Sequence, residues 1–345
     1  MIKSVTITLV LFRSVKNIKA ENPGKDVEDM KKNRMGKLDL LVTEFCFGAL
    51  PMGPLQANIP IDYGAHLIRK AWNHGVNFFD TAESYQTYPY LQKALIDCPE
   101  AIIATKSTAS TYEEMEKSIF KAQKELGRSI INIFHLHAAR ATPAVFEERK
   151  GAFECLKDYK KKGIVQAIGI STHAVDVVEK AAEVSDIDII FPIINIDGMG
   201  IIRGNTSTMV KAIQKAYLRG KGIYAMKVLA GGHCIDRLVD AIEFVRNIRE
   251  ISSIAIGVVK EVELDFHLLH FNQQSIPQEL LNQCLDRKQK KPVILNFCRK
   301  CRICSETCPS GAITMGSDRP LINYEKCLAC GYCLPVCPEF NIRFA

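Results

Sequence analysis

Short apolar runs alternate with longer amphipathic segments from about residue 37 to about residue 265. Eight runs rich in β-branched and aromatic residues predict strands over 45–50, 77–82, 101–107, 131–137, 165–172, 188–195, 222–229 and 253–258. Between them, apolar residues recur at helical spacing over 63–74, 112–126, 146–162, 174–184, 209–219 and 234–248. Several of these segments end in a glycine, which suits a helix C-cap. Eight strand–helix units predict a closed (β/α)8 barrel of the TIM type.

The main competing architecture is a doubly wound open sheet, which expects a G-x-G-x-x-G turn after an early strand. The sequence has no such turn. Residues 261–297 predict a terminal helix followed by a polar linker. We therefore expect a leader over 1–35, either disordered or due to a start codon placed upstream of Met30. After the leader we expect a barrel over 36–275, a basic linker over 276–292 and a small domain over 293–345.

The small domain carries two copies of one cysteine pattern, C-x2-C-x2-C-x3-C-P. The copies are formed by Cys298, Cys301, Cys304 and Cys308, and by Cys327, Cys330, Cys333 and Cys337. This is the spacing of two-cluster ferredoxins, in which three close thiolates hold one [4Fe–4S] cube and the fourth ligates the other cube. The pattern therefore predicts that Cys337 completes the first cluster and Cys308 the second.

A zinc knuckle and a disulfide framework are the alternatives for these cysteines. Zinc prefers two well-separated ligand pairs, and a disulfide framework does not explain a proline repeated in register. The segments 311–315 and 319–324 suit a hairpin between the two motifs. We expect a small α+β ferredoxin-like domain in which ligation of two [4Fe–4S] clusters supplies much of the folding free energy.

The composition, with 47% hydrophobic and 24% charged residues, is that of a globular protein. Of the 13 cysteines, the five outside the motifs show no pairing pattern, and free thiols beside oxygen-labile clusters indicate a reducing cytoplasm. The apolar run over 5–12 is too short to span a bilayer, although a weak signal peptide remains an alternative. No nucleic-acid motif is present, so we expect neither a membrane nor a nucleic acid as a partner.

The net charge of +7 is unevenly distributed, because basic residues gather after Asp286. They are Arg287, Lys288, Lys290, Lys291, Arg299, Lys300 and Arg302. One interpretation is a solvated linker. The other is a docking collar for an acidic redox partner such as a ferredoxin or a flavodoxin, because opposite charges steer encounter.

Candidate catalytic residues fall at neighbouring strand ends, where the active site of a (β/α)8 barrel forms. Asp80 belongs to the end of the second predicted strand, Lys106 to the third and His137 to the fourth, while Tyr85 lies in the loop after the second. Each alone also suits a cap, a core edge or a solvated charge. Together they indicate a catalytic group. His135 lies deeper in the same strand, and we expect it either to pack in the core or to support the group.

The sequence here resembles the aldo-keto reductase family in its motifs FFDTAESY (78–85), ATKS (104–107), FHLHAA (134–139), GIST (169–172) and MKVLAGG (226–232). The resemblance implies that Tyr85 is the proton donor, that Lys106 and Asp80 are its supporting ion pair, and that His137 orients the substrate. The chemistry is consistent, because a tyrosine with a pKa of about 10 donates a proton at neutral pH only where a cation eases phenolate formation.

The resemblance also implies a nicotinamide cofactor, NADPH or NADH. Ser171 and Asn195 match carboxamide contacts, and the expected phosphate contacts are Gly231, Gly232, Gly257 and Lys260. The serine and arginine usual in the family near Lys260 are missing. TYPYL (87–91) also replaces the usual glycine and glutamate, as in members fused to a ferredoxin domain.

Hydride transfer moves two electrons, whereas each cluster passes one. A flavin or a substrate that tolerates radicals would have to separate the pair, and although the sequence shows no flavin fingerprint, a flavin is not excluded. We expect an oxidoreductase that acts on a small carbonyl or alcohol. The runner-up is an iron–sulfur electron carrier whose barrel is a docking or radical-substrate scaffold without nicotinamide turnover.

Overall fold

Eight parallel strands close into a barrel in the computed structural model, which describes residues 30–286, 291–295, 298–339 and 341–344. Around the barrel the strands follow the order β10-β3-β4-β5-β6-β7-β8-β9. Their bounds are β3 (Phe45–Gly48), β4 (Phe78–Asp80), β5 (Ile102–Ser107), β6 (Ile131–His137), β7 (Val165–Thr172), β8 (Ile189–Pro192), β9 (Gly222–Ala225) and β10 (Ser253–Gly257). Each strand lies within a predicted run, so the (β/α)8 architecture is confirmed.

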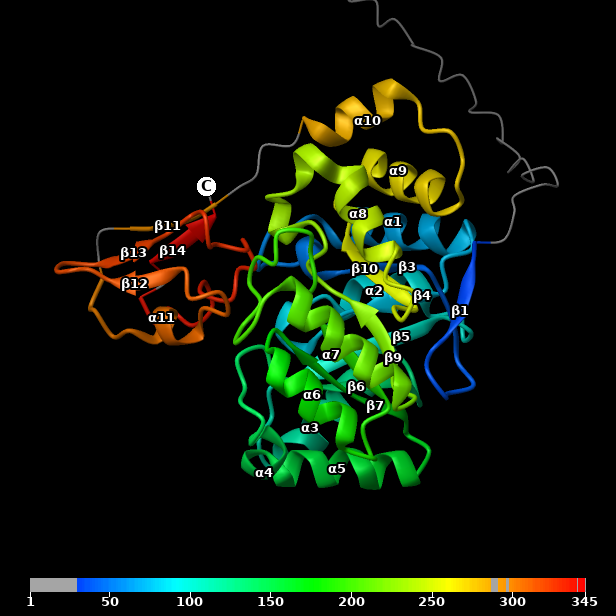
Figure 1. The fold of residues 1–345 in the computed structure, drawn as a ribbon, viewed down its shortest axis with the longest axis horizontal. Coiled ribbons are helices and arrows are strands. Elements are labelled where there is room, and N and C mark those ends of the chain that lie inside the picture. The colour runs from blue at the N-terminus through cyan, green and yellow to red at the C-terminus, as the bar shows by residue number, and fades with distance from the viewer. Residues whose placement is uncertain (1–29, 287–290, 296–297, 340, 345) are drawn as a thin grey trace, which may run out of the picture.

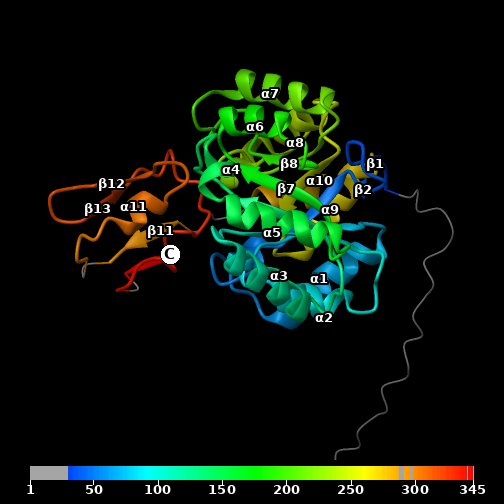
Figure 2. The same ribbon diagram turned by 90° about the horizontal axis from the view of Figure 1, so that it is seen from below.

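Helices surround the barrel (Figures 1 and 2). Those over the barrel are α1 (Ile61–Asn73), α2 (Tyr88–Leu95), α3 (Tyr112–Leu126), α4 (Val145–Glu148), α5 (Lys150–Lys161), α6 (Val175–Glu183), α7 (Thr206–Leu218), α8 (Leu238–Arg246) and α9 (Glu261–Phe271). Helix α2 lies outside the predicted segments. The helix predicted over 146–162 is divided at Arg149, whose guanidinium donates to the carbonyl oxygens of Ser107, Ala109 and His137.

Two apolar layers hold the barrel together. Alternate strand residues point inward and form a compact interior that includes Phe78, Ile133 and Tyr224. The intervening residues, such as Phe79 and Phe134, pack outward against the helices. Strands buried on both faces need continuous apolar sequence rather than alternation, which is the pattern from which these strands were predicted.

A short hairpin precedes the barrel. Strand β1 (Lys32–Arg34) pairs antiparallel with β2 (Leu41–Thr43), and Met35 between them is fully buried against the barrel interior. The expected leader therefore differs from the structure at its end, because residues 30–35 are part of this packed hairpin. Its remainder, including the apolar run over 5–12, lies outside the described residues.

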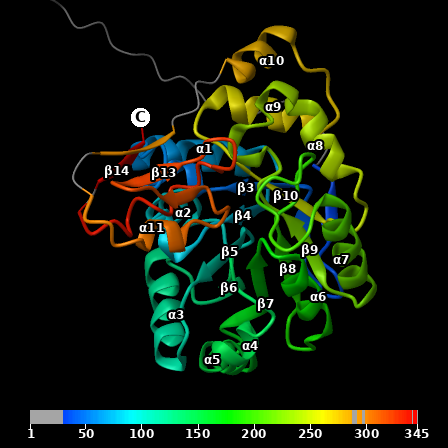
Figure 3. The ribbon, with the colours of Figure 1, turned by 60° about the vertical axis from the view of Figure 1, so that its left-hand side comes forward.

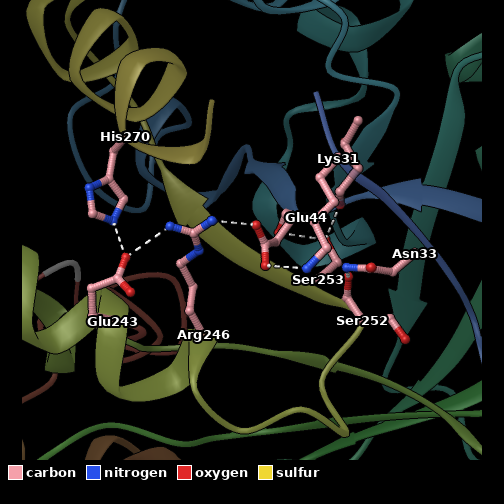
Figure 4. Close-up of polar contacts among 9 residues, drawn as sticks. Lys31, Asn33, Glu44, Glu243, Arg246, Ser252, Ser253 and His270 are labelled. Carbon is pink, nitrogen blue, oxygen red and sulfur yellow. Dashed lines mark hydrogen bonds and ion pairs between the residues drawn. The ribbon is translucent and has the colours of Figure 1, made fainter. Parts of the chain in front are cut away.

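Buried ion pairs tie the hairpin side of the barrel to α8 and α9 (Figure 4). Arg246 donates to Glu44 at 2.8 Å and to Glu243 at 2.9 Å. Nε2 of His270 in α9 lies 2.9 Å from Glu243. The side chains of Arg246 and Glu44 are only 12% and 9% exposed, so their pairing compensates charges that are largely removed from water.

The C-terminal module is a separate small fold beside the barrel (Figures 1 and 2). Strand β11 (Pro292–Ile294) pairs with β14 (Ile342–Phe344), while β12 (Ile313–Met315) pairs with β13 (Pro320–Ile322) as the predicted hairpin. Helix α11 (Ile303–Thr307) lies within the first cysteine motif. The expected linker over 276–292 is partly helical, since α10 (Gln278–Leu285) packs on α9. Within the described part of the chain, no helix combines the length and apolarity needed to cross a bilayer.

Candidate active site and cluster loops

Asp80 and Lys106 form a buried ion pair at the ends of β4 and β5. Nζ of Lys106 donates to both carboxylate oxygens of Asp80, at 2.7 and 2.9 Å, and to the carbonyl oxygen of Thr81 at 2.6 Å. Burial raises the pKa of Asp80 and lowers the pKa of Lys106, and the attraction between the two charges opposes both shifts. The pair fixes a positive charge at the mouth of the barrel.

Tyr85 lies at the end of a short 3-10 helix (Glu83–Tyr85) that follows β4. The ammonium of Lys106 is 4.8 Å from the centroid of its ring, and the ring of His137 stands edge-on at 6.0 Å. Burial raises the pKa of Tyr85 well above 10 and lowers the pKa of His137 well below 6.5. The structure thus brings Asp80, Lys106, Tyr85 and His137 together, with a protonated phenol and a neutral imidazole at neutral pH.

His135 supports this group from inside the barrel. Its Nε2 lies 2.7 Å from the hydroxyl of Tyr224, which donates to Oδ2 of Asp80 at 2.9 Å. Both residues are completely buried. His135 therefore contacts Asp80 through Tyr224, which favours the supporting role over simple packing, the two alternatives expected from the sequence.

Tyr332 of the C-terminal module reaches into the same site. Its hydroxyl is 3.3 Å from the Tyr85 hydroxyl and 3.1 Å from Nε2 of His137. The sequence analysis did not identify this residue, because Tyr332 lies between Cys330 and Cys333 in a position that the cysteine motif leaves free. An aromatic residue inside a metal-binding loop was the available signal.

The cysteines of the module surround two hollows, and each hollow is lined by the four cysteines that the crossed pattern groups together. The first is lined by Cys298, Cys301, Cys304 and Cys337. The second is lined by Cys308, Cys327, Cys330 and Cys333. Among the described residues, no three His, Cys, Asp or Glu side chains converge as a single ion requires. Thiols set around a hollow instead fit a group larger than one ion, such as a [4Fe–4S] cube.

The two hollows differ in their distance from the barrel. The loop that carries the second one contacts the barrel directly, since Nε2 of His233 lies 2.8 Å from the carbonyl oxygen of Cys327 and Arg140 donates to that of Cys308 at 2.6 Å. Cys301 of the first hollow is exposed, whereas Cys330 of the second is buried. Figure 3 shows the module in front of the barrel strands.

The expected carboxamide contacts are only partly available. Oγ of Ser171 is buried and has no hydrogen-bond partner, so it can bind a polar ligand group. The Asn195 side chain is already satisfied, because its amide donates to the carbonyl oxygen of Met199 at 2.9 Å and accepts from the Met199 amide at 2.8 Å.

The expected phosphate contacts do not form an open site in this arrangement. A Cβ on Gly231 would lie 2.2 Å from the carbonyl oxygen of Leu328, so the cluster loop already covers that glycine, while Gly257 faces Pro51. Gly232 has a left-handed backbone, and its amide donates to the carbonyl oxygen of Leu229. The side chain of Lys260 is exposed, and its amide donates to Glu263. Of the expected dinucleotide contacts, the hydroxyl of Ser171 is therefore free to bind a ligand, whereas Asn195 is satisfied within the chain and Gly231 is covered.

Lys227, after β9, is a second residue that the sequence analysis missed. Its backbone is left-handed, with φ of 60°. Burial lowers the pKa of its ammonium, and the thiols of Cys330 and Cys327 oppose that shift. Lys227 therefore lies near the loop that carries Cys327 and Cys330.

Several of the basic residues predicted as a docking collar make contacts within the module. Residues 287–290 lie outside the described part of the chain. Arg299 is 3.3 Å from Glu339, and Lys300 donates to the carbonyl oxygen of Ser317 at 2.8 Å. The ammonium of Lys291 lies 5.3 Å from the ring of Tyr324. Arg302 is exposed and lines the first hollow.

Comparison with known proteins agrees with this architecture. The model of the aldo/keto reductase family matches residues 44–247, and that of the 4Fe-4S dicluster domain matches residues 297–341. The chain belongs to the aldo/keto reductase family and carries a C-terminal 4Fe-4S dicluster domain. This is the family that the motifs predicted.

Particular relatives resemble each half. L-Galactose dehydrogenase of Arabidopsis thaliana is 24% identical over 213 residues, which are 57% of this chain and 65% of that protein. Pyridoxal 4-dehydrogenase of Microbacterium luteolum is 22% identical over 205 residues, 46% and 60% of the two chains. An uncharacterized ferredoxin of Methanocaldococcus jannaschii is 39% identical over 54 residues, 15% and 36% of the two chains. The chain spans less than two thirds of each of these relatives.

Solved structures show the same barrel fold. A putative aldo-keto reductase from Pseudomonas aeruginosa superposes with a TM-score of 0.60 at 19% identity, over 70% of this chain and 94% of that one. An aldo-keto reductase from Bacillus halodurans in its holo form gives a TM-score of 0.59 at 16% identity, over 74% and 96% of the chains.

Proposed function

We propose that the barrel interconverts a small carbonyl compound and its alcohol, with NADPH or NADH as the hydride carrier, and that the two [4Fe–4S] clusters pass single electrons. The observation that carries this proposal is the position of Lys106. Its ammonium lies 2.7 Å from Asp80 and 4.8 Å from the Tyr85 ring centroid. A reducing cytoplasm is the compartment in which free thiols and such clusters persist together.

The residues divide the work of carbonyl reduction. The bound dinucleotide would supply a hydride to the carbonyl carbon. Tyr85, whose raised pKa keeps its hydroxyl protonated, would donate the proton to the oxygen. Lys106 stabilises the negative charge that develops on the oxygen and on Tyr85, and neutral His137 orients the carbonyl through Nε2. Two relatives that are named as dehydrogenases of L-galactose and of pyridoxal support a reaction of this class.

The arrangement of the two hollows supports an order of electron transfer. The first is lined by exposed Cys301 and Arg302, where an acidic one-electron carrier such as a ferredoxin or a flavodoxin would dock. The second adjoins the barrel. Electrons would therefore pass between the partner, the first cluster, the second cluster and the barrel. A flavin could separate electron pairs into single electrons, although the sequence shows no flavin fingerprint.

A second candidate function is an iron–sulfur electron carrier without nicotinamide turnover. It is favoured by the contact of Leu328 with Gly231, because Leu328 occupies the position expected for a pyrophosphate. The two candidates differ in what the barrel does with a nicotinamide, because only the first requires NADPH or NADH to bind and react.

Anaerobic assays on the full chain with both clusters test the proposal. NADPH and NADH oxidation is followed with a series of small aldehydes and ketones in wild type, Tyr85→Phe and the surface control Tyr217→Phe. The proposal expects Tyr85→Phe alone to lose about 10²–10⁴-fold in rate, the usual size of general acid catalysis, with cluster absorbance unchanged. Absence of oxidation in wild type with every carbonyl would favour the second candidate.

A further inference from the structure

The hydroxyl of Tyr332 occupies the position that the proposed reaction gives to the substrate. Tyr85 and His137 are the residues that would hold a carbonyl oxygen, and the Tyr332 hydroxyl lies 3.3 Å from the hydroxyl of the first and 3.1 Å from Nε2 of the second. The Tyr332 ring is nearly parallel to Tyr85, at 24°, and edge-on to His137, at 81°. One phenol and one carbonyl compound cannot share this place.

The loop that presents Tyr332 is seated firmly on the barrel. Leu328 is 1% exposed and belongs to the main apolar core of the barrel. A Cβ on Gly331 would lie 2.1 Å from the carbonyl oxygen of Leu55, which shows that the two backbones touch. The Tyr332 ring itself packs on the apolar group formed by Leu55, Ala82 and Tyr85. These contacts fix the loop from both of its ends.

The same loop covers two positions at which ligand groups were expected. Leu328 covers Gly231, where a pyrophosphate was expected, and Tyr332 covers Tyr85, where the carbonyl was expected. Ser171 lies outside these contacts and keeps its unpaired hydroxyl. One segment of the chain therefore accounts for both obstructions.

We propose that residues 327–333 form an access loop over the barrel site, and that Tyr332 is the residue that excludes carbonyl compounds from Tyr85 and His137. The identity of the excluded compound rests on the proposed function. A carbonyl binds only after Tyr332 withdraws, so the side chain sets how readily the site opens. Because the loop also carries ligands of the second cluster, the ferredoxin-like module contributes a residue to the barrel site.

Chemical labelling of His137 tests this without a substrate or a nucleotide. Diethyl pyrocarbonate acylates accessible imidazole nitrogens, and peptide mass spectrometry gives the rate at each histidine. Exposed His74 in the same molecule serves as the internal reference. The anaerobic holoprotein is compared as wild type, Tyr332→Phe and Tyr332→Ala. The matched control is Tyr324→Phe, because the Tyr324 hydroxyl bonds only to Pro292 within the module among its described contacts.

We expect the rate at His137, relative to His74, to rise about tenfold in Tyr332→Phe, because this change removes both hydrogen bonds of the Tyr332 hydroxyl. Tyr332→Ala also removes the ring and should give a larger rise, and Tyr324→Phe should give none. Equal relative rates in all four proteins would overturn the proposal. If cluster absorbance shows that Tyr332→Ala has lost the second cluster, Tyr332→Phe decides the matter alone.

This outcome is separate from that of the proposed function. A protein that never oxidises NADPH still yields a labelling rate, so failure of carbonyl turnover leaves the access loop to be judged on its own. Conversely, a protein that turns over carbonyls but labels His137 equally with and without Tyr332 contradicts only the access loop.

Discussion

Lys106 and Asp80 form an ion pair from which water is almost excluded, since their side chains are 1% and 6% exposed. Lys106→Met leaves the Asp80 carboxyl buried without its partner, and we expect it to lower the free energy of unfolding by about 3–5 kcal/mol. The double variant Lys106→Met/Asp80→Asn removes both charges and should recover part of that loss. Urea unfolding followed by fluorescence of Trp72, the one tryptophan of the chain, measures both. Equal losses in the two variants would contradict this account.

The Arg246–Glu44 pair allows a comparison of buried and exposed charges. Arg246→Met should cost up to about 3 kcal/mol, because the largely buried Glu44 would keep only Lys31, at 3.4 Å and 57% exposed, as a cationic partner. Lys215→Met is the matched control, since Lys215 and Glu183 also pair at 2.8 Å but are 44% and 53% exposed. That variant should cost less than about 1 kcal/mol. The same urea titrations test the difference, and similar losses would refute the role of burial.

Acid should destabilise the fold through its buried histidines. Burial lowers the pKa of His173 from 6.5 to about 3. As the pH falls below 6.5, His173 becomes protonated in the unfolded chain but stays neutral in the folded chain. The free energy of unfolding therefore decreases from there down to about pH 3. Between pH 7.5 and 5.5 this single group should cost about 1 kcal/mol.

Unfolding titrations of His173→Gln at the two pH values measure that contribution. The variant should lose less stability on acidification than wild type does. Exposed His74→Gln serves as the control and should keep the wild-type dependence. An identical pH dependence in all three proteins would show that His173 does not contribute.

The strands and the candidate catalytic residues were predictable because each depends on the local pattern of apolar and polar residues. Runs buried on both faces, such as β8 with its sequence IIFP, are continuously apolar, and the strand ends place Asp80, Lys106 and His137 on one rim. The Tyr332 contact was not predictable in this way. It joins residues 247 positions apart, and nothing in the cysteine spacing says which barrel loop the module meets. The hydrogen bond from the Asn195 amide to Met199 likewise depends on the conformation of one loop.

Crossed ligation of the clusters predicts a specific pairing of cysteine variants. Cys337→Ser should remove the same cluster as Cys301→Ser, although Cys337 belongs to the other motif. Cys308→Ser should behave like Cys330→Ser. Each variant should lose about four of eight iron atoms per chain, and electron paramagnetic resonance of the reduced protein identifies the cluster that remains. Grouping of Cys337→Ser with Cys330→Ser would disprove the crossed assignment.

Tyr332 is flanked in the chain by Cys330 and Cys333, two of the residues that line the second hollow. Metal ligation would add to the contacts that hold this loop, so dismantling the cluster would leave Tyr332 restrained by the barrel contacts alone. Oxygen that destroys an iron–sulfur centre would then ease the opening of a site of carbonyl chemistry in the same molecule. Oxidative damage to the C-terminal module would therefore change which compounds can enter the barrel site.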